Sequence, residues 1–166
     1  MDGNLNRELV IIGGGPAGLM AAESALANGA SNVSVYERMG SVARKFLIAG
    51  KGGLNLTHSE PMPQFIQRYL PQTRSIGHWL REFGPDAVRA WAAGLGVETF
   101  VGSSGRVFPH DLKAAPLLRA WVRRLRANGV RFHVNHEWLG WDEAGRLRFS
   151  RSEEHTSELQ SRQCIS

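Results

Sequence analysis

The sequence predicts an α/β fold built on a βαβ unit with parallel strands, and three observations support this prediction. A run at residues 8–12, apolar from Leu9 onward, is rich in β-branched side chains, as expected of a buried parallel strand. It leads into Gly13-x-Gly15-x-x-Gly18 and an alanine-rich helix at residues 16–28. A second strand at residues 32–37 alternates in polarity and ends in an acidic residue.

Each glycine of this turn has a physical role in holding a dinucleotide. Gly13 lets the chain turn sharply, Gly15 leaves no Cβ between backbone and pyrophosphate, and Gly18 lets the helix pack closely. The helix N-terminus directs N–H groups at the phosphates. Glu37 follows Gly18 by 19 positions, close to the spacing of about 20 expected for a carboxylate on a ribose hydroxyl. The predicted contacts are Gly13, Gly15, Pro16, Ala17, Gly18, Glu37 and Arg38.

The identity of the dinucleotide is a finer question. Glu37 disfavours NADP, because the 2′-phosphate would meet a carboxylate where an arginine is wanted. The glycine pattern alone fits both FAD and NAD. An ordinary βαβ unit with a tight turn is the alternative without a ligand, and the combined context disfavours it.

Residues 44–58 form the next segment of interest, with apolar residues on both sides of a Gly-Lys-Gly-Gly turn. We expect a loop that presses its backbone against a flat ring or a phosphate, with Lys45 or Lys51 supplying charge. The residues alone fit an ordinary surface loop equally well.

Several short motifs together resemble those of the BaiN-like bacterial NAD(P)/FAD-dependent flavoproteins. They are Gly-Gly-Gly-Pro-Ala-Gly at 13–18, Arg-Lys at 44–45, Gly-x-Gly at 50–52, Asn55, Thr57 and Gly-Arg-Val-Phe-Pro at 105–109. The chain departs from that family at Ala43, Gly53-Leu54 and His58, where many members carry Gly, Arg-Cys and Asn. The resemblance implies bound FAD, with the flavin ring near Lys45, Gly50, Gly52, Asn55 and Thr57. It identifies no catalytic acid or base; Lys45 and His58 are candidates only.

Downstream patterns indicate a helical insertion followed by a return to the sheet. Residues 62–94 predict helices, the last starting at Pro85, with the aromatic side chains in the core. Strands are predicted at 97–101 and 106–109, then a helix capped by Asp111 and ended at Gly129. Residues 130–134 predict a further parallel strand, and a β-ribbon should run to Phe149.

Composition indicates a globular protein without a membrane span, since 42% of the 166 residues are hydrophobic and 21% charged. The start of the chain lacks signal-peptide features, so we expect a cytoplasmic protein. Cys164 is the single cysteine, which excludes an internal disulfide, and no metal site is predicted. The net charge of +5 reflects an arginine-rich stretch at 119–131, which predicts a solvated helix face rather than a nucleic-acid surface.

Residues 151–166 lack apolar periodicity and resemble the translation of a short-read sequencing adapter. We therefore expect residues 1–150 to be the N-terminal part of an FAD/NAD(P)-binding domain, and 151–166 to be a disordered, non-native tail. The family resemblance implies that relatives continue with a substrate domain, so the Rossmann-like domain is expected to be incomplete here.

The leading functional hypothesis is an FAD-dependent oxidoreductase that transfers hydride between a nicotinamide or organic substrate and the flavin. NAD(P)H is a candidate electron donor, and the fragment alone is expected to be inactive. A flavin-dependent tRNA-modifying protein and a non-catalytic dinucleotide-binding protein are the alternatives. The substrate and the oligomeric state are not predicted.

Overall fold

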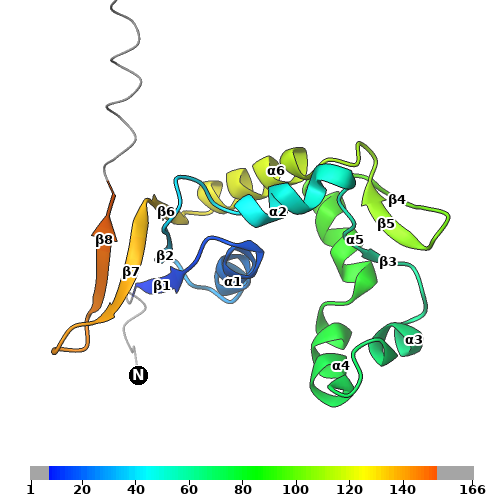
Figure 1. The fold of residues 1–166 in the computed structure, drawn as a ribbon, viewed down its shortest axis with the longest axis horizontal. Coiled ribbons are helices and arrows are strands. Elements are labelled where there is room, and N and C mark those ends of the chain that lie inside the picture. The colour runs from blue at the N-terminus through cyan, green and yellow to red at the C-terminus, as the bar shows by residue number, and fades with distance from the viewer. Residues whose placement is uncertain (1–7, 153–166) are drawn as a thin grey trace, which may run out of the picture. The chain divides into compact units, whose positions relative to one another are not determined.

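The computed structural model describes residues 8–152, which divide into two compact units (Figure 1). Residues 8–44 and 125–152 belong to the first unit, and residues 45–124 to the second. Among the described helices, none combines the length and apolar character that a membrane span requires.

The first unit contains the predicted βαβ motif. Strand β1 (Leu9–Ile12), helix α1 (Pro16–Ala27) and strand β2 (Val33–Glu37) follow one another, and β6 (Arg131–Val134) joins the same sheet. The strand order is β1-β2-β6, and both pairings are parallel. Residues 130–134 were predicted to return to this sheet after a long crossover, and the pairing of β6 with β2 confirms it.

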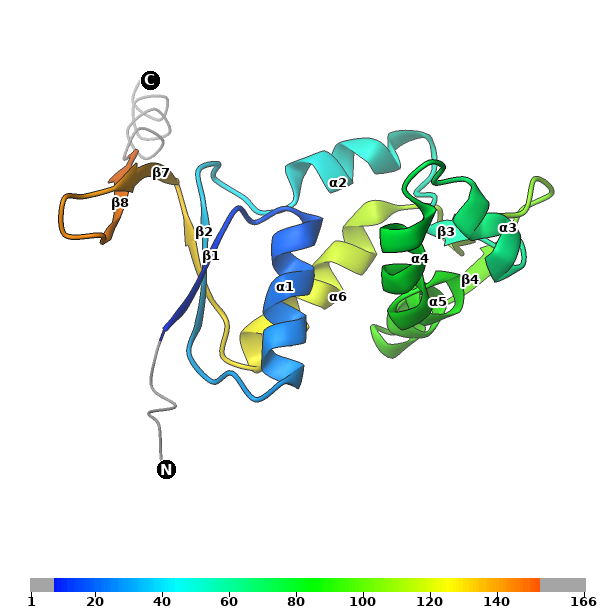
Figure 2. The same ribbon diagram turned by 90° about the horizontal axis from the view of Figure 1, so that it is seen from below.

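A β-hairpin covers one side of this sheet. Strands β7 (His136–Trp141) and β8 (Leu147–Arg151) pair antiparallel, with Trp138 opposite Phe149. The hairpin lies on one side of the parallel strands and α1 on the other (Figure 2). Tyr36 joins the two layers, because its ring stacks on Phe149 at 4.2 Å between centroids and on His133 at 4.4 Å.

The core of the first unit lies between α1 and the middle strand. Leu19 and Ala22 of α1 are fully buried, and so are Val33 and Val35 of β2. The central position of β2 explains its burial on both faces, whereas Leu9 and Ile12 on the outer strand remain more than two-fifths exposed.

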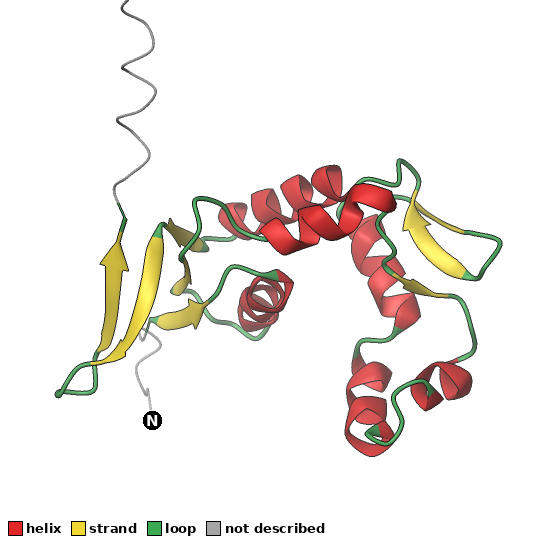
Figure 3. Cartoon of the chain, viewed as in Figure 1, coloured by secondary structure: helices red, strands yellow, loops and turns green. Residues whose placement is uncertain are grey.

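The second unit combines helices with a small antiparallel sheet (Figure 3). Its helices are α2 (Arg44–Ala49), η1 (Gly50–Gly52), α3 (Met62–Gln67), α4 (Thr73–Glu82), α5 (Pro85–Gly94) and the greater part of α6 (Ala114–Ala127). The sheet orders β3 (Thr57–His58), β5 (Arg106–Pro109) and β4 (Thr99–Val101). Leu54, Ala92, Ala114 and Leu117 form a buried cluster between these helices, beside the edge-to-face pair Trp91 and Trp121.

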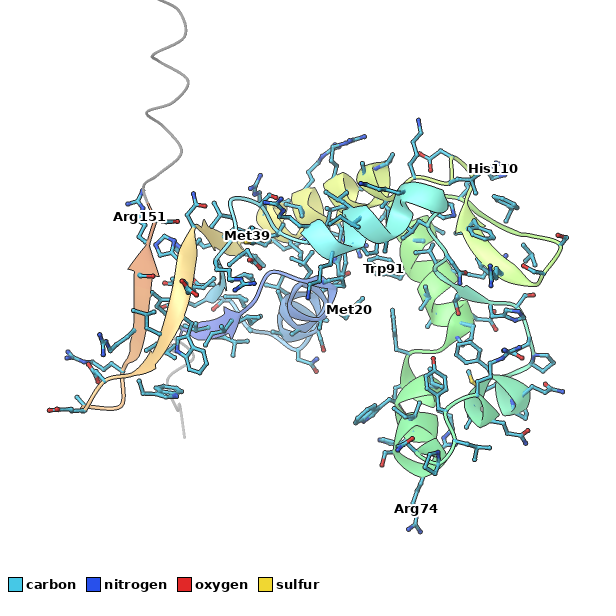
Figure 4. The ribbon with its side chains drawn as sticks, viewed as in Figure 1. Met20, Met39, Arg74, Trp91, His110 and Arg151 are labelled. Carbon is cyan, nitrogen blue, oxygen red and sulfur yellow. The ribbon has the colours of Figure 1, made fainter. Side chains whose placement is uncertain are left out.

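The prediction that the aromatic side chains of residues 62–94 lie in the core is wrong at Tyr69, Trp79 and Phe83. Tyr69 is 39% exposed, Trp79 is 63% exposed and Phe83 is 40% exposed. For Trp79 the reason lies at Gly77, where a Cβ would come within 3.3 Å of Ile66. Helix α4 thus packs on α3 through the side that carries Gly77, and Trp79 lies about 200° around the helix from it. Arg74 also points away from the unit (Figure 4).

Two local predictions also need correction. Residues 44–52 are not a loop: they form helix α2 and a 3-10 turn, consistent with the helix-forming sequence Arg-Lys-Phe-Leu-Ile-Ala. Asp111 does not cap α6, which begins at Ala114; its carboxylate accepts from the N–H of Lys113, just ahead of the helix.

The last described strand reaches slightly further than predicted. Arg151 closes β8 opposite His136 (Figure 4), and the Ser152 N–H donates to the Asn135 carbonyl. Strand pairing uses backbone groups, so it continues for the two residues after Phe149 whatever side chains stand there. Residues 153–166 of the predicted tail lie outside the described residues.

Candidate functional site

The glycine turn between β1 and α1 has the geometry that a dinucleotide site needs. Gly13 adopts φ of +100°, and its N–H donates to the Tyr36 carbonyl at 2.8 Å, which fixes the turn against β2. A Cβ at Gly18 would collide with the carbonyl oxygen of Gly13, so the helix could not lie this close to the turn with any other residue there.

Gly15 differs from both of these glycines. An added Cβ would meet no atom within 4 Å, and its φ of −74° is one that any residue adopts. Neither packing nor backbone strain within the described residues therefore requires a glycine here. The open space is the volume that a side chain at position 15 would occupy. The sequence predicts that a pyrophosphate approaches the backbone there.

The N-terminus of α1 is available to an anion. Gly15 is the N-cap and contributes no side-chain hydrogen bond, Pro16 occupies the first turn, and this turn contains no acidic residue. The first N–H groups of a helix lack intrahelical partners and carry the positive end of the helix dipole. In this 12-residue helix those groups, including Ala17 and Gly18, are positioned to bind phosphate oxygens.

Glu37 lies at the end of β2 and holds the turn in place. Its Oε2 accepts a hydrogen bond from the N–H of Gly14 at 2.9 Å, and its Oε1 accepts one from Met39 at 2.9 Å. A carboxylate oxygen has two lone pairs, so each oxygen retains capacity for another donor. The half-buried carboxylate can therefore support the glycine turn and accept from ribose hydroxyls at the same time.

A pocket of about 300 Å³ opens at this edge of the sheet. Ile12, Gly13 and Tyr36 line it together with Glu37 and Arg38, at the carboxyl ends of β1 and β2. The other wall is residues 136–138 of β7. Ligands of open α/β sheets bind outside the carboxyl ends of the strands, which is where this pocket lies.

The predicted site residues of the second unit lie along one segment. Lys45 is exposed on α2, and Thr57 lies in β3. A Cβ at Gly50 would come within 2.6 Å of the Ala114 Cβ, so close helix packing already requires a glycine there. Gly52 has open space around it. The side-chain amide of Asn55 satisfies its surroundings when its nitrogen faces two backbone carbonyl oxygens. In this orientation the nitrogen donates to the Thr57 carbonyl at 2.8 Å and to the Val107 carbonyl at 3.2 Å.

His58 has a structural role in this unit. The Glu60 N–H donates to its Nδ1 at 3.1 Å, so Nδ1 carries a lone pair and Nε2 carries the proton. Nε2 then donates to the Ser104 carbonyl at 3.0 Å, which ties β3 to the turn between β4 and β5. Both ring nitrogens of His58 therefore take part in hydrogen bonds within the unit, whereas the other candidate, Lys45, lies exposed on α2.

The structure thus gathers the predicted residues into two groups. Those of the first unit meet at the carboxyl edge of the parallel sheet: Gly13, Gly15, Pro16, Ala17, Gly18, Glu37 and Arg38. Those of the second unit lie between α2 and β3: Lys45, Gly50, Gly52, Asn55 and Thr57. Sequence reasoning missed the β7 wall of the pocket. Its only sequence signal was the alternation of His136 and Trp138 in the predicted ribbon.

Known proteins resemble this chain in sequence. A 3-dehydro-bile acid delta(4,6)-reductase of Clostridium scindens is 29% identical over 126 residues. That alignment covers 75% of this chain and 30% of the reductase, so the chain spans about a third of the length of its curated relative.

Solved structures share the fold. A 3-ketosteroid-delta4-(5alpha)-dehydrogenase from Rhodococcus jostii RHA1, in complex with 4-androstene-3,17-dione, superposes with a TM-score of 0.59 at 17% identity, covering 91% of this chain and 44% of that chain. A flavocytochrome c3 fumarate reductase gives 0.63 at 17% identity, covering 81% and 28%.

The family match covers nearly the whole chain. The sequence profile described as "HI0933-like protein Rossmann domain" matches residues 7–165, which include both units and all the predicted site residues. A Rossmann domain agrees with the parallel βαβ arrangement of the first unit. The chain belongs to the HI0933-like Rossmann domain family.

Proposed function

We propose that the protein binds FAD through the first unit and acts as an FAD-dependent oxidoreductase. The observation that carries this proposal is the open space at Gly15 beside the uncapped N-terminus of α1. A pyrophosphate fits both features, because it needs close backbone approach and N–H donors together. The names of the relatives, a reductase, a dehydrogenase and a fumarate reductase, support the redox assignment.

The residues of the first unit have distinct parts in holding the cofactor. The backbone at residues 13–18 binds the pyrophosphate, and Glu37 accepts from the ribose hydroxyls of the adenosine half. Glu37 also favours FAD over NADP in this site, since its carboxylate would repel a 2′-phosphate. Lys45, Gly50, Gly52, Asn55 and Thr57 are proposed to contact the flavin half.

When bound, FAD supplies the capacity to accept and donate hydride. The chain's own contribution is to hold and orient the cofactor. We propose a nicotinamide, NADH or NADPH, as electron donor, and a small organic molecule as substrate. The bile acid and ketosteroid named for two relatives favour a polycyclic or otherwise largely apolar substrate.

Purification of the whole protein tests this proposal. We expect a yellow protein with non-covalently bound flavin, released as FAD on denaturation. Anaerobic addition of NADH or NADPH should bleach the flavin absorbance. A protein that purifies without flavin and does not bind added FAD would contradict the proposal. Bound FAD that neither nicotinamide reduces would favour a non-catalytic role for the dinucleotide.

A further inference from the structure

The pocket at the carboxyl edge of the sheet has one wall without a function. Glu37 and the glycine turn account for a ribose and a pyrophosphate, but residues 136–138 of β7 line the same space. His136 and Trp138 lie two positions apart on a strand, so their side chains project from the same face. Phe149, the cross-strand partner of Trp138, stacks on Tyr36, which shows that this face of the hairpin is turned toward β2.

A backbone hydrogen bond and two ring contacts hold His136 in one position. Its Nδ1 lies 2.8 Å from the Val134 carbonyl oxygen, which can only accept, so Nδ1 carries the proton and donates. In the neutral form of such a ring the lone pair lies on Nε2. Edge-to-face contacts with Tyr36 and His133, both at 5.7 Å between centroids, fix the ring plane. A hydrogen-bond acceptor is thus presented by a preorganised side chain.

Trp138 offers a flat apolar surface on the same wall. It is 41% exposed, although it lines the pocket. Its only ring contact in the described part of the chain is an edge-to-face approach to Trp141 at 6.4 Å, an arrangement that covers at most one face of the indole. Indole faces bind nucleobases well, because base–aromatic stacking is favourable for every base.

We propose that β7 carries the adenine-recognition surface of this dinucleotide site, where Trp138 stacks on the adenine ring and His136 Nε2 accepts a hydrogen bond from its exocyclic amino group. The inference rests on the proposed FAD function, and it adds the residues that select the base. An acceptor facing that position favours adenine over hypoxanthine or guanine, which carry a carbonyl oxygen there. Glu37 and the glycine turn supply no such discrimination.

Nucleotide binding to the whole apoprotein tests the inference without any catalytic readout. Calorimetric titration with ADP and with inosine diphosphate compares an amino group with a carbonyl at the same ring position. We expect wild type to bind ADP about tenfold more tightly, the scale of one unmade hydrogen bond. His136→Phe retains an aromatic ring against Tyr36 and should remove most of this preference. His133→Phe is the matched control, because His133 belongs to the same aromatic cluster but does not line the pocket.

Trp138 has an equally close control on its own strand. Trp138→Ala should weaken ADP and inosine diphosphate alike, by about tenfold, since stacking does not depend on the amino group. Leu139→Ala, at an exposed β7 position outside the pocket, should leave both affinities unchanged.

The outcomes separate this inference from the proposed function. An unchanged ADP preference in His136→Phe, or equal effects of Trp138→Ala and Leu139→Ala, would overturn the inference while FAD binding stands. A wild-type apoprotein that binds neither ADP nor FAD would overturn both.

Discussion

The carboxylate of Glu37 accepts a hydrogen bond from the backbone N–H of Gly14 at 2.9 Å, across 23 positions of sequence. This contact ties the end of β2 to the glycine turn that follows β1. The second carboxylate oxygen accepts from Met39 and so orders the backbone beyond β2 as well. One acidic side chain thus shapes the turn that is proposed to hold a pyrophosphate and retains lone pairs for the neighbouring ribose.

Glu37→Gln should weaken FAD binding about tenfold, or roughly 1.4 kcal/mol. The amide removes the negative charge from the ribose contact, and its NH₂ group must face either the Gly14 or the Met39 N–H, where it cannot accept. Titration of the apoprotein with FAD measures the change. Glu143→Gln, at an exposed position in the β7–β8 turn, is the control and should bind as wild type does. Equal affinity of Glu37→Gln and wild type would mean that the carboxylate does not contact the ribose.

Gly15→Ala should separate folding from cofactor binding. The added Cβ meets no atom within 4 Å, so the free energy of unfolding of the apoprotein should change by about 1 kcal/mol or less. The same methyl group lies where the pyrophosphate must approach, so FAD affinity should fall by at least tenfold, and Gly15→Val should abolish binding. Gly40→Ala is a matched control, since its Cβ would make an ordinary contact of 3.4 Å. A flavin-loaded Gly15→Val protein would refute this placement of the phosphates.

The pH dependence of stability should include a contribution from Glu8. Hydrogen bonds from Ser34 at 2.6 Å and from Arg131 at 2.9 Å hold the pKa of the Glu8 carboxyl below its ordinary value of 4.5. A carboxyl with a lower pKa in the folded state binds fewer protons there than in the unfolded state. Its stabilisation is therefore present above pH 4.5 and is lost as the pH falls through the folded-state pKa.

Urea unfolding between pH 3 and pH 7, about the range of carboxylate titration, measures this contribution. Glu8→Gln should lower the free energy of unfolding near neutral pH and flatten its decrease in acid, while Glu143→Gln should retain the wild-type slope. The effect is expected to be small, because the Glu8 side chain is 42% exposed and solvent screens the pair. An identical acid slope for Glu8→Gln and wild type would show that the hydrogen bonds from Ser34 and Arg131 to Glu8 do not persist in solution.

Prediction from sequence succeeded where the signal is local and failed where it depends on distant neighbours. Within the glycine turn, backbone conformation at Gly13 and close packing at Gly18 involve only a few neighbouring residues, so both glycines are readable from the sequence. Trp79 has the helical spacing of a core residue, but its exposure depends on which side of α4 meets Ile66. Likewise, the place of His136 and Trp138 at the pocket depends on how the hairpin packs against β2, where Phe149 stacks on Tyr36 across more than a hundred positions.

The 166-residue chain by itself should neither remain a stable monomer nor hold FAD tightly. Within the described residues, β1 pairs with β2 along one edge only, and Leu9 and Ile12 on this strand are 41% and 44% exposed. An unpaired strand edge with exposed apolar side chains favours association with other chains. Trp138 and Trp141 add exposed apolar surface on the hairpin.

Gel filtration with simultaneous detection of protein and flavin absorbance, followed by thermal unfolding of the eluted species, tests this expectation. We expect species larger than a monomer, little bound flavin and a broad transition, because the apolar surface along β1 is buried only by association. Replacing Leu9 and Ile12 together by Lys should shift the chain toward the monomer, since charged side chains at a strand edge oppose pairing with another chain. Replacing Leu139, which is 52% exposed on the hairpin, by Lys is the control for a general gain in solubility. A monomeric wild-type chain that melts cooperatively with flavin bound would show that this part of the protein is self-sufficient and that the free edge of β1 is of no consequence.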